Sequence, residues 1–127
     1  MDSKQSPFLA DPVLLEALTE RAILVSCAEE RVLFRQDQEC IGLFVLHSGH
    51  ASLEMRSPAG EVVALLAADD GSLLGLPAVL SGTRYTLTAI ALKGSRVGFI
   101  EREIFLELLE SNPALSLKAL QIMAAIT

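Results

Sequence analysis

Short segments rich in apolar residues make up most of this chain, and turn-forming residues separate them. Some of these segments alternate between apolar and polar residues. The alternation is clearest in Ala51-Ser52-Leu53-Glu54-Met55-Arg56, where every second residue is apolar, as in a strand with one buried face. Near-regular spacing of such segments predicts a sandwich, a barrel or a jelly roll. The expected strands cover residues 23–26, 31–35, 43–47, 51–56, 61–67, 72–74, 85–92 and 96–100.

Helices are expected before and after the strands. Asp11 and Pro12 form a strong helix start, because Asp is a favoured N-cap and Pro suits the first helical position. Residues 101–111 carry an apolar stripe at helical spacing. An Asn-Pro pair then repeats the start signal for a second helix over residues 112–126. Residues 1–10 are expected to be a flexible lead.

We interpret the stretch Gly75–Leu92 as the segment around which the rest of the chain is arranged. Gly75 tolerates a positive φ and allows another backbone or a ligand to approach closely. Pro77 follows and opens a short apolar helical turn, which Ser81-Gly82-Thr83 ends. A helical turn that begins beside a strand leaves backbone N–H groups that bind anions.

This stretch resembles the phosphate-binding cassette of the cyclic nucleotide-binding domain, as in the Crp/Fnr (catabolite-activator) family of bacterial regulators. In that family a Glu binds the ribose 2′-hydroxyl and an Arg pairs with the cyclic phosphate. Gly75 and Ala78 match the family pattern, but Leu76 stands at the position of the Glu and Tyr85 at the position of the Arg. Arg84 lies one place early, which on a strand means the opposite face.

The resemblance implies a ligand site in the cassette. Leu76 is interpreted as apolar volume that fills the pocket, Tyr85 as a half-buried strand aromatic, and Arg84 as a solvated turn charge. Thr86 and Thr88 fall on the small and Thr positions of the family pattern. The candidate ligand-binding residues are Gly75, Leu76, Pro77, Ala78, Arg84, Tyr85 and Thr86.

The resemblance continues over roughly residues 11–127, through glycine spacing and helix order. Asp37 stands at a family glycine, which is tolerable because Asp can adopt the left-handed conformation. The implied fold is mainly β with flanking helices: a double-stranded β-helix jelly roll of the cyclic-nucleotide-binding type over residues 11–111. Residues 112–127 would begin a dimerisation helix, and the family's DNA-binding domain is absent from this chain.

The charge of the chain argues against direct contact with nucleic acid. It carries 10 basic and 16 acidic residues, a net charge of −6, and has no cluster of Lys and Arg. DNA is therefore expected to be contacted only through a region outside this chain. An apolar run near 18 residues and a signal-peptide core are both missing, so no membrane contact and a cytoplasmic location are expected.

The sequence gives little support for a metal site or an iron–sulfur cluster. His47 and His50 flank one turn, and this spacing does not place both side chains on one face of a strand. Cys27 and Cys40 are too few for an iron–sulfur cluster, which needs several closely spaced thiolates. A cupin-type enzyme needs clustered His and Glu, so enzymatic function ranks last and the chain is not expected to be an enzyme.

Two regulatory functions stay open. The first is the sensory domain of a Crp/Fnr-type transcription regulator whose altered cassette senses a small molecule other than cyclic AMP, or is held in one state. The second is a module that still binds a cyclic nucleotide through backbone amides and Thr86. The cofactor stays unknown, since a cyclic nucleotide is possible but its Glu and Arg anchors are missing.

The last helix is expected to form a homodimer. Leu117, Leu120 and Ile126 recur with Ala124 on one apolar face. A helix at the end of a β roll buries only part of its circumference, and exposed apolar area costs about 25 cal/mol per Å². Two-fold pairing with a second copy would cover this face. Deletion from Asn112 onward is expected to leave a soluble, monomeric roll.

Overall fold

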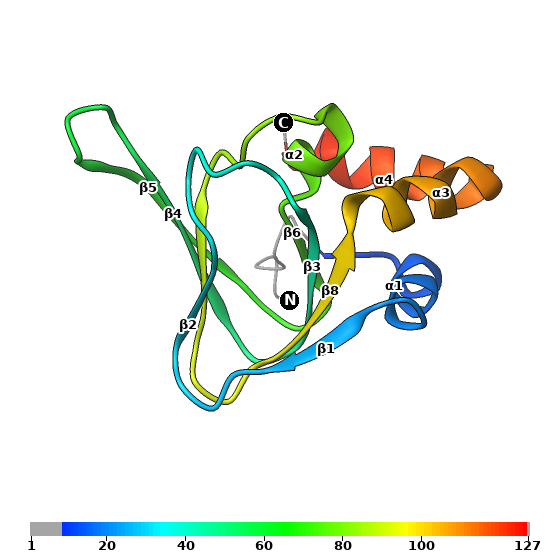
Figure 1. Ribbon diagram of the computed structural model, residues 1–127, viewed down its shortest axis with the longest axis horizontal. Coiled ribbons are helices and arrows are strands. Elements are labelled where there is room, and N and C mark those ends of the chain that lie inside the picture. The colour runs from blue at the N-terminus through cyan, green and yellow to red at the C-terminus, as the bar shows by residue number, and fades with distance from the viewer. Residues whose placement is uncertain (1–8, 127) are drawn as a thin grey trace, which may run out of the picture.

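The computed structural model describes residues 9–126 of the chain. Within this range the order of strands and helices agrees with the sequence prediction (Figure 1). The elements are α1 (Pro12–Thr19), β1 (Ile23–Ser26), β2 (Arg31–Phe34), β3 (Gly42–Ser48), β4 (Ala51–Arg56), β5 (Val62–Ala68), β6 (Ser72–Leu74), α2 (Leu76–Ser81), β7 (Thr88–Ala91), β8 (Arg96–Glu101), α3 (Arg102–Ser111) and α4 (Pro113–Ile126).

Two antiparallel four-stranded sheets form the roll, in the orders β1-β8-β3-β6 and β2-β7-β4-β5. The helices α1, α3 and α4 gather beyond β3 and β8, on the side away from the second sheet (Figure 1). The hairpin of β4 and β5 extends away from the body on the opposite side (Figure 1). This arrangement confirms the expected mainly β jelly roll with flanking helices.

The core has two layers, and strand β3 belongs to both. Leu43 and Val45 face the helices, where they pack with buried residues of α1, α3 and α4. Phe44 and Leu46 face the other sheet. Because both faces of β3 are covered, its sequence is a continuous apolar run and does not alternate with polar residues.

The seventh strand is shorter than expected. The sequence predicts a strand over residues 85–92, whereas β7 covers only Thr88–Ala91. The reason lies in the backbone of Tyr85, whose N–H donates to Gln38 O at 3.0 Å and whose carbonyl accepts from Asp37 N at 2.8 Å. These bonds tie Tyr85 to the loop after β2, and pairing of β7 with β4 begins only at Thr88.

Asp37 and Asp11 are two acidic residues whose local roles follow from their sequence context. Asp37 has a φ of 71°, so the left-handed conformation expected at this position is confirmed.

Asp11 caps α1 through a hydrogen bond of 3.1 Å from Val13 N to its Oδ2. Its Oδ1 accepts a hydrogen bond from Lys118 of α4 at 3.0 Å, which is the main cause lowering the pKa of Asp11. The two terminal helices are therefore linked.

The lead before Asp11 is joined to the roll where the structure describes it. Leu9 forms an isolated bridge with Ser72, and Ala10 N donates to Gly71 O at 2.9 Å. Residues 1–8 of the expected lead lie outside the described residues. No helix in the described range is long and apolar enough to cross a membrane.

Candidate functional site

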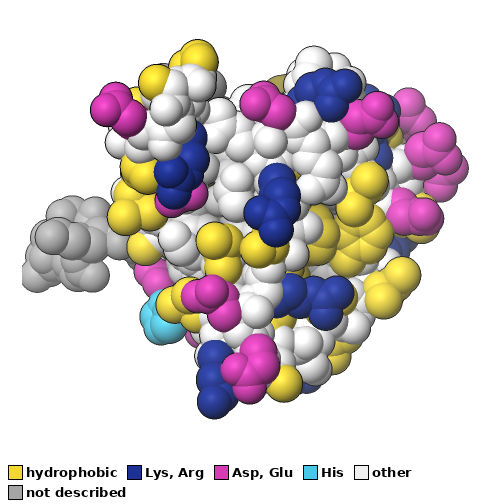
Figure 2. Space-filling model, turned by 60° about the vertical axis from the view of Figure 1, so that its left-hand side comes forward, with side chains coloured by type: hydrophobic (Ala, Val, Ile, Leu, Met, Phe, Trp, Pro, Cys, Tyr) yellow, Lys and Arg dark blue, Asp and Glu magenta, His cyan; other side chains and the backbone are white. Residues whose placement is uncertain are grey.

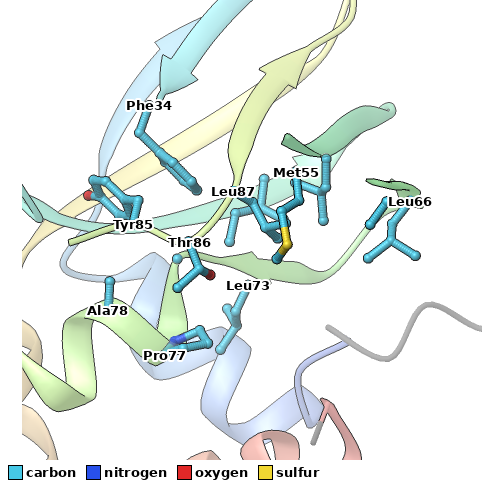
Figure 3. A pocket seen from close by; sticks show the side chains of 13 residues that line it. Phe34, Met55, Leu66, Leu73, Pro77, Ala78, Tyr85, Thr86 and Leu87 are labelled. Atoms are coloured by element: carbon cyan, nitrogen blue, oxygen red, sulfur yellow. The ribbon is translucent and has the colours of Figure 1, made fainter. Parts of the chain in front are cut away.

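A cavity of about 200 Å³ lies between the start of α2 and the sheet that carries β4 and β5 (Figure 3). None of the described residues that line it is charged, and only Tyr85 and Thr86 have side-chain oxygen atoms. The lining residues are Phe34, Leu53, Met55, Ala64, Leu66, Leu73, Leu74, Gly75, Pro77, Ala78, Tyr85, Thr86 and Leu87.

Gly75 is the N-cap of α2 and shapes the inner wall of the cavity. It has a left-handed φ of 93°, which favours glycine. A Cβ at this position would lie 2.9 Å from Cε1 of Tyr85 and 3.4 Å from the ring of Phe34. The close approach expected at Gly75 is therefore made by an aromatic ring of the protein itself.

Tyr85 is a buried structural residue, and the expectation of a half-buried strand aromatic is wrong. Its side chain is 1% exposed and stacks on Phe34 with ring centroids 3.9 Å apart. The hydroxyl donates to Gly42 O at 2.7 Å and accepts from the N–H groups of Gly42 and Ile41 at 3.1 and 3.2 Å. Burial raises the pKa of Tyr85 to about 12, so the phenol keeps the proton that it donates.

The hydroxyl of Tyr85 thus points away from the cavity and is fully engaged by backbone groups of Ile41 and Gly42 at the start of β3. Only the ring faces the cavity, beside Phe34 and above Ala78 (Figure 3). The residue at the position of the family's arginine therefore supplies an apolar wall in place of a cation.

Leu76 and Arg84 lie outside the cavity. Leu76 is fully buried on the other side of α2, in the layer with Leu14, Val79 and Phe105. It fills the helical core, and the interpretation that it fills the pocket is incorrect. Arg84 is exposed, and its Nη1 donates to Asp37 O at 2.8 Å. It borders a separate depression, so its guanidinium does not reach the cavity lining.

Thr86 and Thr88, the two threonines of the cassette, have different surroundings. Thr86 is exposed and lines the cavity, with its hydroxyl oxygen on the side that faces Leu73 (Figure 3). The hydroxyl of Thr88 accepts a hydrogen bond from Gln36 N at 2.9 Å. Thr86 is therefore positioned to meet a ligand, whereas Thr88 fixes the loop after β2.

The cavity residues do not fit the polar groups of a cyclic nucleotide. A buried phosphate needs a cation or several donors, and the lining provides no positive charge. Pro77 has no N–H, so the first turn of the six-residue α2 presents only the amides of Leu76 and Ala78. No carboxylate among the lining residues is placed to bind a ribose hydroxyl.

Sequence reasoning missed the wall that β4 and β5 contribute. Met55 and Leu66 line the cavity from these strands, and Leu87 completes the wall beside Thr86 (Figure 3). The signal was present in the period of two, which places Leu53 with Met55 and Ala64 with Leu66 on one face. The sequence does not show which of the two sheet faces lies over the cassette.

The histidines lie apart from the cavity. His50 Nδ1 is 3.0 Å from Asp69 Oδ1 at an exposed turn. The pKa of His47 is lowered, first by burial and then by the charge of Arg96. Among residues 9–126, no group of three or more His, Cys, Asp and Glu side chains is arranged to hold a metal ion.

The sequence matches the family model described as "Cyclic nucleotide-binding domain" over residues 24–112. No curated protein matches the chain. The matched range contains every strand except the first residue of β1, and it contains all of the cavity lining, so the family assignment covers the whole candidate site.

Solved structures share the fold. The catabolite activator protein of Thermus thermophilus superposes with a TM-score of 0.76 at 20% identity, over 94% of this chain and 57% of that one. The sensor domain of the transcriptional regulator DNR from Pseudomonas aeruginosa gives 0.71 at 23% identity, with 90% and 77% covered. A transcriptional regulator from Thermotoga maritima gives 0.73 at 20% identity, with 84% of each chain covered. The present chain thus corresponds to little more than half of the Thermus protein.

Proposed function

Since this chain belongs to the family of cyclic nucleotide-binding domains, we propose that it is the sensory domain of a Crp/Fnr-type transcription regulator whose effector is not a cyclic nucleotide. Its role is regulatory and not catalytic. The likeness in fold to the Thermus and Pseudomonas regulators supports the regulator class. Gly75, Pro77, Ala78 and Thr86 are the cassette residues that we assign to ligand contact, with the ring of Tyr85 as the inner wall.

The observation that carries this proposal is the engagement of Tyr85. Its hydroxyl is held by Gly42 and Ile41, and its ring occupies the space beside Gly75. A cyclic phosphate would therefore meet an aromatic face at the point where the family has a guanidinium. Each lost charge-assisted hydrogen bond costs about 1.5–3 kcal/mol. The loss of two anchors lowers affinity roughly a hundredfold or more.

Calorimetric titration of the purified chain with cyclic AMP and cyclic GMP tests the proposal. We expect no saturable heat at ligand concentrations up to about a millimolar. A micromolar dissociation constant for either nucleotide contradicts it. The regulator class is tested separately by the coding sequence downstream of Thr127, where a helix-turn-helix motif is expected.

The alternative function, cyclic nucleotide binding through backbone amides and Thr86, is favoured by one observation. Thr86 is exposed at the cavity with its hydroxyl turned toward Leu73. The amide contribution is weakened by Pro77, which removes one donor from the first turn of α2. If the unmodified chain binds a cyclic nucleotide and the Thr86→Val variant does not, this alternative is supported.

DNA contact is assigned to a region outside this chain. On the face shown in Figure 2, basic side chains are interspersed with acidic and apolar ones and do not form a stripe. The net charge of −6 opposes the counterion release that drives binding to phosphate backbones. We expect no shift of a generic duplex at low salt by the chain alone, and salt-sensitive binding below a micromolar would contradict this assignment.

A further inference from the structure

We propose that the cavity beside α2 binds a small, uncharged, mostly apolar molecule of about the size of one or two fused aromatic rings, with the Thr86 hydroxyl as its one polar side-chain contact. This inference rests on the proposed function, because it names the class of effector that the same site takes. The proposed ligand differs from the family's usual ligand, because it has neither a phosphate nor a sugar.

The size of the cavity supports this class of ligand. It encloses about 200 Å³ and is lined by Phe, Leu, Met and Ala side chains. Apolar cavities of about 150 Å³ with such a lining stay dry and accept a benzene ring. A ligand with one ring therefore fits with space to spare, and two fused rings come close to filling the cavity.

The charge of the lining excludes ionic ligands. No charged side chain lines the cavity, and the guanidinium of Arg84 is held outside it by Asp37 O. An ionised ligand would lose its hydration without gaining a partner, which is strongly unfavourable in an apolar site. An uncharged ligand avoids this cost and gains apolar contact with Leu73 and Leu87.

The β4–β5 hairpin supplies an outer wall of the cavity that is partly exposed to solvent. Leu66 lines the cavity but is 44% exposed, so a bound ligand would remove part of its side chain from water. Strand β5 is the last strand of its sheet and pairs only with β4. The outer wall can therefore adjust to a ligand without breaking the rest of the sheet.

The chain contains a built-in reporter for this site. Tyr85 is its only tyrosine and it has no tryptophan, so Tyr85 dominates the intrinsic fluorescence. The ring of Tyr85 lines the cavity. A naphthalene derivative that absorbs where tyrosine emits would accept energy from Tyr85 when bound there.

The test uses 2-naphthol as the uncharged probe and 2-naphthalenesulfonate as the charged probe with the same ring system. We expect 2-naphthol to quench Tyr85 emission saturably, with a dissociation constant on the order of 100 µM. The sulfonate should bind at least tenfold more weakly. Equal or tighter binding of the sulfonate, or no saturable quenching by 2-naphthol, overturns the inference.

Two matched pairs of variants locate the probe. Ala64→Leu fills the cavity, whereas Ala67→Leu adds the same volume on the outer face of β5. Leu66→Ser removes apolar lining, whereas Leu65→Ser changes a residue that is 66% exposed and not part of the lining. Both cavity variants should weaken 2-naphthol binding about tenfold, and both controls less than twofold. Equal losses in the controls would place the probe on the outer face of β5 and overturn the inference.

Competition with cyclic AMP separates the two proposals. If 2-naphthol fails to bind and cyclic AMP fails too, the inference is wrong and the proposed function stands. If cyclic AMP binds at micromolar concentration and displaces 2-naphthol, the proposed function is wrong. If 2-naphthol binds as described and excess cyclic AMP does not displace it, both are supported.

Discussion

Tyr85 and Gly75 are in such close contact that a Cβ at position 75 would lie 2.9 Å from Cε1 of Tyr85. The contact joins the start of α2 to the ring that stacks on Phe34. Here the glycine makes room for an aromatic side chain.

We expect Gly75→Ala to destabilise the fold by about 2–5 kcal/mol, because a left-handed φ costs about 1–2 kcal/mol and overpacking against Tyr85 adds about 1–3 kcal/mol. Gly60→Ala is the matched control. Gly60 has a similar φ of 89°, but nothing lies within 4 Å of the Cβ that would be added. Urea denaturation of both variants measures the difference in their free energies of unfolding. Equal losses of stability in the two variants would mean that the contact with Tyr85 adds no cost.

Removing only the hydroxyl of Tyr85 should also destabilise the protein. Tyr85→Phe removes the acceptor of the N–H groups of Gly42 and Ile41, and it leaves the C=O of Gly42 with only the weak donor Cys40 Sγ at 4.0 Å. A buried unsatisfied polar group costs about 1–3 kcal/mol. Denaturant unfolding should show a lower midpoint with an unchanged slope. A neutral result would mean that water satisfies these groups, and that the hydroxyl is not needed to hold the loop before β3.

The ionisation of Tyr85 should be coupled to unfolding at high pH. Burial raises its pKa from 10.0 to about 12, so the folded state holds the phenol proton more tightly than the unfolded state. The resulting stabilisation is fully present below about pH 10 and is lost as the pH rises toward 12. The absorbance of tyrosinate should therefore appear near pH 12 or together with unfolding. Reversible ionisation near pH 10 in the folded protein would contradict the buried placement.

Much of this fold was predictable because its signals are local. The alternation in β4, the turn residues between strands and the Asp11-Pro12 helix start each determine structure within a few residues. The left-handed Asp37 was predictable for the same reason. The boundary of β7 was not, because the backbone of Tyr85 pairs with Gln38 and Asp37, which are distant in sequence.

The site was less predictable than the fold. Alignment to the cassette identifies Leu76 and Tyr85 as substitutions, but it does not give the direction of their side chains. Leu76 lies in the buried cluster that also contains residues of α1 and α3, so its burial belongs to the helical core. The contribution of Met55 and Leu66 depends on how the two sheets curve around α2, which is a property of the whole roll.

Introducing the family's glutamate should not restore nucleotide binding. Leu76→Glu places a carboxyl group in the apolar layer of Leu14, Val79 and Phe105. We expect a loss of more than about 3 kcal/mol in stability and no gain in affinity for cyclic AMP. Leu76→Met is the control, since a volume-conserving change costs less than about 1.5 kcal/mol. Thermal melts followed by circular dichroism, together with calorimetric titration, measure both effects, and a stable Leu76→Glu variant that binds cyclic AMP would contradict the burial argument.

The last prediction concerns assembly through α4. This helix has two apolar faces in the described structure. Leu115, Ala119 and Ile122 pack in the core with residues of α1 and α3, whereas Leu117 and Leu120 are 57% and 58% exposed. Ala124 is also exposed, and the side chain of Ile126 lies outside the described residues. The outer face is therefore the one that a second copy would cover.

The same geometry changes how dimerisation should be tested. Deletion from Asn112 onward was expected to leave a monomeric roll, but it would also remove Leu115, Ala119 and Ile122 from the core. Substitutions on the outer face avoid this problem.

We expect Leu117→Glu with Leu120→Glu to convert a two-fold dimer into a folded monomer, because paired copies would bring these charges together in an apolar interface. Val63→Glu with Leu65→Glu is the control, since it adds two charges at exposed apolar positions of β5, away from α4. Light scattering at tens of micromolar protein gives the mass of each variant. If the unmodified chain is already a monomer at that concentration, the outer face of α4 does not pair two copies of this chain.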